Sequence, residues 1–220
     1  MTTHRLNHQA MSKPTGLSLL GAHFIARREA IVLVPYRDGM MIDPKDPTRQ
    51  DKVERWSVGM GSLAKHGGQT RPISVKQSFQ QFHKAVRTRE QAVLWALGLR
   101  IWFRSPVPVL QQHVDAAFSL YYQGGSDGLK AVGALVRAGR MQEAADEFLK
   151  WDMDAEGVRK KGLLARRELE RTLFRAGDYG ELNPVRLYRG DPKTTPFEEY
   201  IVTERDLKGW TQPDDEDDEE

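Results

Sequence analysis

The 220-residue sequence contains no cysteine. Disulfides, thiolate metal sites and a catalytic cysteine are therefore excluded, and the stability of the fold must come from its core. The chain also lacks any uninterrupted apolar run of about 18 residues, the length that a membrane-spanning helix needs, so we expect no membrane insertion. Residues 1–16 lack the apolar core that a secretory signal peptide requires, and we expect no signal peptide.

Motifs for metal binding and for nucleophilic catalysis are also missing. The six histidines show no His-Glu-x-x-His spacing, so a zinc amidase or peptidase would lack its ligands. No Gly-x-Ser-x-Gly elbow is present, and the histidine nearest to Ser57 and Ser62, His66, is expected in a loop. We therefore expect neither a metal nor a cofactor.

Charge is distributed unevenly along the chain. The formal net charge is +2, but the last eight residues, PDDEDDEE, hold seven of the 31 acids. Without them the chain has 33 bases and 31 − 7 = 24 acids, a net charge of +9. So basic a body favours a polyanionic partner such as nucleic acid, anionic cell wall or an acidic membrane surface. The tail itself is typical of a disordered, solubilising end.

Hydrophobic periodicity predicts an α+β fold. Leu17, Leu20, Phe24 and Ile25 recur at helical spacing, and Pro35 ends that pattern. A short strand over 56–62 indicates a small β-hairpin, with 40–55 as an inserted loop or extended tip. Further helices are expected over 76–86, 90–102, 109–122, 129–137, 141–151 and 163–174, with a turn at 123–128. Their tryptophans, among them Trp95, Trp102 and Trp151, are expected in the core rather than as a sugar platform.

This pattern divides the chain into three parts. We expect a flexible arm over 1–15, one folded domain over 16–180 and a carboxy-terminal extension over 181–220 that shows no clear element.

Two carboxylates stand where the first helix meets the hairpin. Glu29 precedes the apolar residues Ile31 and Leu33, and apolar surroundings favour the protonated form of a carboxyl group. Asp38 follows nine residues later in a Tyr-Arg-Asp-Gly turn, where a carboxylate should stay ionised. Glycoside cleavage requires two carboxyl groups in such unlike environments. On these residues alone, a solvated helix end and a turn aspartate remain the alternative.

The residues around this pair resemble a known family. The segment F-I-A-R-R-E-A-I-V-L-V-P-Y-R-D-G, residues 24–39, is similar to the opening of the phage-type lysozyme, or endolysin, family, which has its acid glutamate and a Tyr-x-Asp turn at the same spacing. The family continues into Thr-x-Gly-x-Gly-His, and here Ser57, Gly59 and Gly61 take the places of the threonine and the glycines.

A second resemblance lies farther along the chain. AGRMQEAADEFLKWD, residues 138–152, and GLLARRELERTLF, residues 162–174, are similar to consecutive segments of the same family. In the family the arginine-rich helix packs against the helical lobe and borders the substrate groove, which implies that Arg166, Arg167 and Glu170 anchor the structure first. The resemblance covers roughly residues 20–178.

The resemblance implies a lysozyme-like fold and a muramidase that cleaves the β-1,4 bond between N-acetylmuramic acid and N-acetylglucosamine in peptidoglycan. Glu29 would be the general acid, Asp38 the carboxylate that stabilises the transition state, and Ser57 the hydroxyl that holds the attacking water. Substrate contacts would come from Tyr36, Gly59, Gly61 and Arg166. A free endolysin of this kind would be made in the host cytoplasm and would reach the cell wall through a separate pore protein.

Two other functions remain open at this point. The protein would be a virion component if residues 181–220 and the inserted loop dock onto a phage structural protein, and its catalysis would then be reduced or would serve local wall penetration. A basic helical module for nucleic acid is compatible with the charge, but no recognisable motif supports it, and we expect no nucleic-acid partner.

The sequence departs from the family pattern at the hairpin. Between Asp38 and Ser57 lie 57 − 38 − 1 = 18 residues, where the family usually has about five, so the hairpin must be longer. Serine at position 57 keeps the hydroxyl group but lacks the β-branch that restricts the rotamer of threonine. Ser62 stands where the family has histidine, so the ion pair of that histidine is missing.

Overall fold

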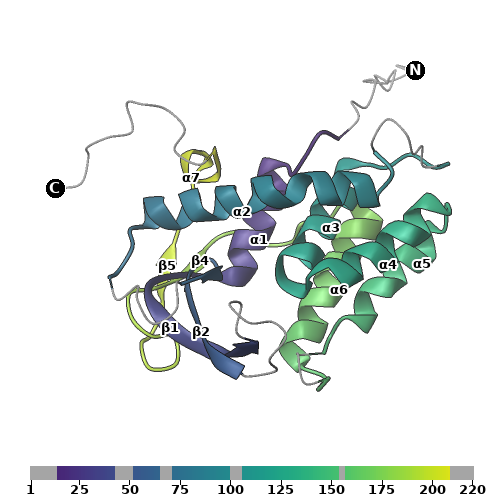
Figure 1. Cartoon of the computed structure of the whole chain (residues 1–220). Coiled ribbons are helices and arrows are strands. Elements are labelled where there is room, and N and C mark those ends of the chain that lie inside the picture. Colours follow the sequence, from purple (N-terminus) through teal and green to yellow (C-terminus); the bar gives the residue numbers. More distant parts are fainter. Residues whose placement is uncertain (1–13, 43–51, 65–70, 100–105, 154–156, 209–220) are drawn as a thin grey trace, which may run out of the picture.

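The computed structural model describes residues 14–42, 52–64, 71–99, 106–153 and 157–208. Its elements are α1 (Leu19–Glu29), β1 (Ile31–Ile42), β2 (Lys52–Gly59), β3 (Ser62–Leu63), α2 (Val75–Ala96), α3 (Gln111–Gly124), α4 (Ser126–Arg137), α5 (Met141–Glu147), a 3₁₀ turn (Phe148–Lys150), α6 (Lys161–Ala176), β4 (Val185–Tyr188), β5 (Glu198–Tyr200) and α7 (Glu204–Lys208). The sheet lies at one end, α3 to α6 form a helical lobe at the other, and α2 runs along both (Figure 1). The α+β prediction is confirmed.

Helix α1 is fixed at both ends. The Ser18 side chain caps it by accepting a hydrogen bond of 2.9 Å from the Gly21 amide. The Ser18 hydroxyl in turn donates to Asp115 of α3 over 2.5 Å. At the other end Ala30 adopts a positive φ of 58°, which turns the chain directly from Glu29 into β1. The last residue of the helix, Glu29, therefore lies at the junction between the sheet and the helical lobe.

The five-stranded sheet has the order β3-β2-β1-β4-β5. Strands β1 and β2 pair antiparallel from Val32 opposite Gly59 to Ile42 opposite Lys52. The 18 residues between Asp38 and Ser57 therefore lengthen the hairpin, as expected. Of the two alternatives for residues 40–55, an inserted loop or an extended hairpin tip, the described residues 40–42 and 52–55 support the second, because residues 39–42 pair with residues 52–55 as strands. Residues 43–51 lie outside the described part of the chain.

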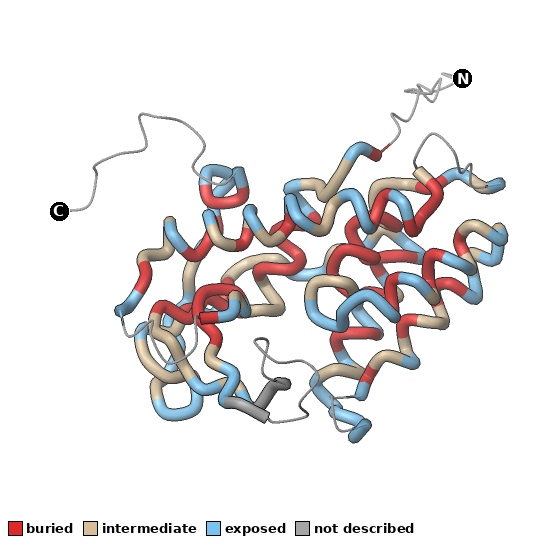
Figure 2. The backbone as a smooth tube through the Cα atoms, in the orientation of Figure 1, coloured by how far each residue is buried: buried red, intermediate tan, exposed pale blue. Residues whose placement is uncertain are grey.

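The expectation of no regular element beyond residue 180 is wrong. Strand β4 pairs in parallel with β1, with Ile31 opposite Leu187, and β5 pairs with β4. Val185 and Leu187 are buried in the main core together with Leu207 of α7. Figure 2 shows buried residues both at the sheet end and in the helical lobe. A boundary at residue 180 therefore does not separate the fold from an appendage. The acidic tail and residues 1–13 of the expected arm lie outside the described residues.

The helices differ from the prediction at α2 and at Gly125. The segment 76–96 is one continuous helix, α2, and the break expected between Val86 and Glu90 is absent because the intervening Arg-Thr-Arg contains no glycine or proline. The turn expected over 123–128 shrinks to Gly125, whose φ of 80° is accessible to glycine and separates α3 from α4. The helix predicted over 90–102 also ends earlier, because α2 stops at Ala96 and residues 97–98 form a turn. The other helices lie where periodicity predicted them.

One hydrophobic core connects the two ends of the molecule. It includes Phe24 and Ile31 at the sheet end and Phe118 and Phe148 in the lobe. A direct hydrogen bond also links the ends, because the hydroxyl group of Tyr122 on α3 donates to the Met60 carbonyl over 2.7 Å. The groups at the junction are therefore held in a fixed arrangement.

Candidate active site

Glu29 lies at the end of α1 with its side chain 15% exposed. Its Oε1 accepts a hydrogen bond from Nη1 of Arg166 on α6. No described residue donates a hydrogen bond to its Oε2, which lies 3.4 Å from the position that a Cβ on Gly61 would occupy. The surroundings of Glu29, expected to be apolar, therefore include a charged partner. One oxygen is anchored by a guanidinium group, and the other faces the turn between β2 and β3.

Arg166 belongs to a buried charge network. Its Nε donates to Glu170 Oε1 over 3.0 Å, and Arg167 donates to the other oxygen of that carboxylate. Ser119 of α3 adds a third donor to Glu170 at 2.5 Å. Buried charges are tolerated only when they are paired in this way. Arg166 was expected to anchor the structure first and also to contact the substrate. Its side chain contacts Glu29 and Glu170, which suits a positioning residue, and its contact with substrate stays a prediction.

Asp38 and Ser57 are neighbours across β1 and β2. The Ser57 hydroxyl donates to Asp38 Oδ2 over 3.0 Å, and Ser57 is 2% exposed. Arg55 donates to the same oxygen through Nε at 3.1 Å and also through Nη2. Asp38 therefore lies in a strand rather than in the solvated turn expected, but its side chain remains 30% exposed. Sequence spacing did not indicate Arg55, which reaches this oxygen through the strand register.

Tyr36 lies close enough to both carboxylates for their charges to act on its hydroxyl group. Burial, followed by the neighbouring charges of Asp38 and Glu29, raises its pKa to about 12. Asp191, in the segment between β4 and β5, contributes in the same direction. Burial and the charge of Glu29 likewise raise the pKa of Tyr122. Both acids therefore act on one region, and Tyr36 is a neutral hydroxyl donor at neutral pH.

Gly59 and Gly61 flank Met60 with φ values of 64° and 77°, a region that favours glycine. A Cβ on Gly59 would lie 3.0 Å from the hydroxyl oxygen of Ser78 on α2, so a larger residue would crowd that helix. The two glycines thus let the backbone pass close to both α2 and Glu29. Their role in substrate binding stays a prediction.

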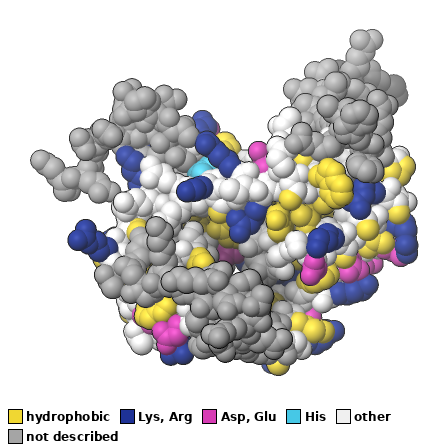
Figure 3. Space-filling view, viewed as in Figure 1, with side chains coloured by type: hydrophobic (Ala, Val, Ile, Leu, Met, Phe, Trp, Pro, Cys, Tyr) yellow, Lys and Arg dark blue, Asp and Glu magenta, His cyan; other side chains and the backbone are white. Residues whose placement is uncertain are grey.

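The tryptophans differ from one another in burial. Trp151 packs against the main core, as expected, whereas Trp95 is 55% exposed, and the core prediction is wrong for it. Trp95 lines a mostly apolar cavity of about 420 Å³ together with Tyr121 and Leu129. Figure 3 shows hydrophobic side chains gathered on the helical half of the molecule. Trp102 lies outside the described residues.

Within the described ranges, no group of three or more His, Asp or Glu side chains could hold a metal ion. None of the helices described is long and apolar enough to cross a membrane. His66 falls outside these ranges.

Comparison with known families gives a direct match. The family model described as phage lysozyme matches residues 44–170. This chain belongs to the phage lysozyme family. The resemblance inferred from the sequence is confirmed. The matched segment contains Ser57, Gly59, Gly61 and Arg166 but begins after Glu29 and Asp38, so the roles of those two carboxylates depend on the geometry described above.

A curated relative, an endolysin of Bacillus phage B103, is 39% identical over 102 residues. The alignment covers 46% of this chain and 37% of the relative, so the chain spans little more than a third of that endolysin.

Solved structures show the same fold. An endolysin from Escherichia coli O157:H7 phage FAHEc1 superposes with a TM-score of 0.54 at 20% identity, over 79% of this chain and 98% of the other. A mutant of P22 lysozyme superposes with a TM-score of 0.51 at 23% identity, over 73% and 99% of the two chains. The lysozyme-like α+β architecture is thereby established.

Proposed function

We propose that this phage lysozyme family member is a muramidase that hydrolyses the β-1,4 bond between N-acetylmuramic acid and N-acetylglucosamine in peptidoglycan. One observation carries the proposal: Glu29 and Asp38 lie at the same junction between the sheet and the helical lobe. Asp38 there accepts a hydrogen bond of 3.0 Å from the hydroxyl group of Ser57. Glycosidases need two carboxyl groups with different partners. Here Glu29 is bound to a buried arginine, and Asp38 is bound to the buried hydroxyl group of Ser57 and to the exposed Arg55.

Glu29 is the general acid in this proposal. Arg166 occupies its Oε1, which leaves Oε2 to carry the proton that is transferred to the leaving glycosidic oxygen. When the proton has left, the negative charge on Glu29 is stabilised by the charge-assisted hydrogen bond from Arg166. General acid catalysis of this kind contributes on the order of 10² to 10⁴ in rate.

Asp38 stabilises the oxocarbenium-like transition state and orients the attacking water. Because the Ser57 hydroxyl donates its hydrogen to Asp38, its oxygen lone pairs are available to accept a hydrogen bond from that water. The pair thereby positions a nucleophile next to a carboxylate that attracts its proton. Tyr36, neutral and half-buried nearby, has a hydroxyl group to offer a sugar ring.

A virion-associated role finds no support in the comparisons, which name endolysins and lysozymes. The segment proposed for docking, residues 181–220, supplies β4, β5 and α7 to the fold itself. The muramidase is therefore the function that the observations favour.

The test compares wild type and Glu29→Gln on purified peptidoglycan, with the products reduced and their end sugars identified by mass spectrometry. We expect N-acetylmuramic acid at the new reducing ends and a loss of about 10² to 10⁴ in rate for the variant. Glu168→Gln, an exposed change on α6, is the matched control and should retain full activity. Products ending in N-acetylglucosamine or anhydro sugars, or more than a tenth of the activity left in Glu29→Gln, would contradict the proposal.

A further inference from the structure

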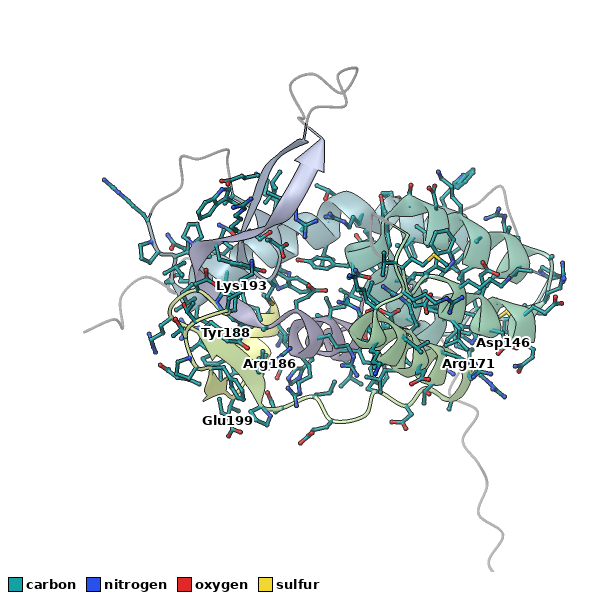
Figure 4. All side chains as sticks on the ribbon, turned by 90° about the horizontal axis from the view of Figure 1, so that it is seen from below. Asp146, Arg171, Arg186, Tyr188, Lys193 and Glu199 are labelled. Atoms are coloured by element: carbon teal, nitrogen blue, oxygen red, sulfur yellow. The ribbon has the colours of Figure 1, made fainter. Side chains whose placement is uncertain are left out.

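A second cavity is lined in part by Arg166. It has a volume of about 540 Å³ and is formed where the end of α1, the first half of α6 and β4 meet. Four of its lining residues are arginines, namely Arg27, Arg28, Arg166 and Arg186, and its single acid is Glu181. Figure 4 shows Arg186 on β4, on the side of that strand where α1 lies. The wall of this cavity is therefore strongly basic.

The positive charges of this wall are incompletely balanced. Arg166 is paired with Glu29 and Glu170, and Arg27 faces Glu181 at 3.7 Å. Arg186 forms no ion pair with any residue in the described part of the chain. The cavity thus presents cationic groups beyond those that its own carboxylates neutralise.

Arg28, which is less exposed than Arg186, also lacks a carboxylate partner among the described residues. Its guanidinium group lies 3.4 Å from the centre of the Phe24 ring, and its Nη1 donates to the Phe24 carbonyl over 2.8 Å. Its Nε is buried and has no hydrogen-bond partner among the residues described. Burial, followed by repulsion from Arg166, lowers the pKa of Arg28 to about 10. A partly buried guanidinium group without a carboxylate partner is unusual, because charges removed from water in proteins are nearly always paired.

We propose that this cavity is a binding site for a phosphate group, held by Arg28 and Arg186 with support from Arg27. Guanidinium groups present planar pairs of N–H donors that match the oxygens of phosphate, and several of them converge on this space. A water molecule takes up roughly 30 Å³ in the liquid, so a phosphate group fits in the cavity with several waters.

Phosphate suits the site better than a carboxylate. A carboxylate brings one negative charge and two oxygens, whereas a phosphate group brings up to two charges and more acceptor oxygens, which three guanidinium groups can share. The group could be free inorganic phosphate or a phosphodiester in an anionic polymer of the cell wall. The two sources share the same chemistry and differ in charge and in substituents.

Isothermal titration calorimetry with inorganic phosphate tests the assignment at constant ionic strength, with chloride as the balancing anion. We expect one saturable site on the wild-type protein and a loss of about tenfold or more in affinity for Arg186→Gln, since a hydrogen bond to a charged group is removed. Arg189→Gln is the matched control. Arg189 lies just after β4, pairs with Glu198 at 3.0 Å and does not line the cavity, so its loss should leave the affinity unchanged.

Arg27→Gln is a second variant that tests the same cavity from α1, and it should also weaken binding. Thermal melting of each variant confirms that the fold is intact. Absence of saturable binding to the wild-type protein, or equal weakening in Arg186→Gln and Arg189→Gln, would overturn the proposal. Equal affinity for acetate at the same ionic strength would overturn the assignment to phosphate.

Two further titrations identify the source of the phosphate. Bis(glycerol) phosphate carries the phosphodiester of a polymer backbone, and affinity comparable with that of inorganic phosphate would support a wall polymer as the ligand. Binding of inorganic phosphate alone would support the free ion. These measurements do not depend on muramidase activity, so the anion site and the proposed function succeed or fail separately.

Discussion

Replacing Glu170 by glutamine is the sharpest test of how the candidate acid is held. The Glu170 side chain is completely buried, and its carboxylate accepts hydrogen bonds from Arg166, Arg167 and Ser119. Arg167 is fully buried as well, and its guanidinium group pairs with no other carboxylate among the described residues. Glu170→Gln therefore leaves a buried cation without its counter-charge.

The expected cost follows from the three donors. A glutamine side chain has one acceptor oxygen and one NH₂ group, so at position 170 the NH₂ group would meet a donor from Arg167 or from the Arg166–Ser119 side. Removing one partner of a buried ion pair costs about 3 to 5 kcal/mol in the free energy of unfolding. For a chain of this size each kcal/mol lowers the melting temperature by about 2 to 4 °C, which gives a decrease of about 6 to 20 °C.

Urea unfolding followed by circular dichroism, together with thermal melting, measures this change. Glu143→Gln is the control, because it makes the same chemical change at an exposed ion pair with Arg140 and should leave stability nearly unaltered. If Glu170→Gln were no less stable than this control, the buried network would not need its central carboxylate, and the account of how Arg166 is held against Glu29 would be refuted.

Two further changes address the site and the core. Ser57→Ala should lower the rate of muropeptide release about three- to tenfold through the lost hydrogen bond, and Ser57→Thr should keep it; equal rates in all three proteins would leave Ser57 with only a structural role. Burial lowers the pKa of His113 to about 4, so the unfolded chain binds a proton below about pH 6.5 and the folded one does not. Stability should therefore fall by about 3 kcal/mol between pH 6.5 and 4, and His113→Gln should show a smaller decrease in urea unfolding over the same range; an identical decrease would contradict this.

Long periodic segments were predictable from the sequence, and short pairing segments were not. Helices α4 and α6 each present several apolar residues at helical spacing, which is a strong local signal. Strand β4 has only four residues and β5 only three, too few for an alternating pattern to stand out. Their existence depends on pairing with β1, which comes from more than 140 positions earlier in the chain.

The residues of the site also fall into two groups, those that motif spacing predicts and those that it does not. Glu29, Asp38 and Ser57 stand in a segment of characteristic spacing, so the family resemblance could find them. Arg55 and Asp191 carry no local signal, because each reaches the site through strand register or through the β4–β5 segment. Sequence spacing therefore finds the residues of a motif but not the charges that tertiary structure brings to them.

Arg55 also gives the lengthened hairpin a consequence at the site. The pairing of Gly39 with Arg55 places this arginine next to Asp38, where it donates to the oxygen that Ser57 also contacts. Both side chains of this ion pair are substantially exposed, at 47% and 30%, and such pairs contribute about 0 to 1 kcal/mol. Displacement of Arg55 from Asp38 by a bound sugar would therefore cost little free energy. The longer hairpin thus holds Asp38 toward Ser57 in the free protein, and the carboxylate stays accessible for the transition-state role proposed for it.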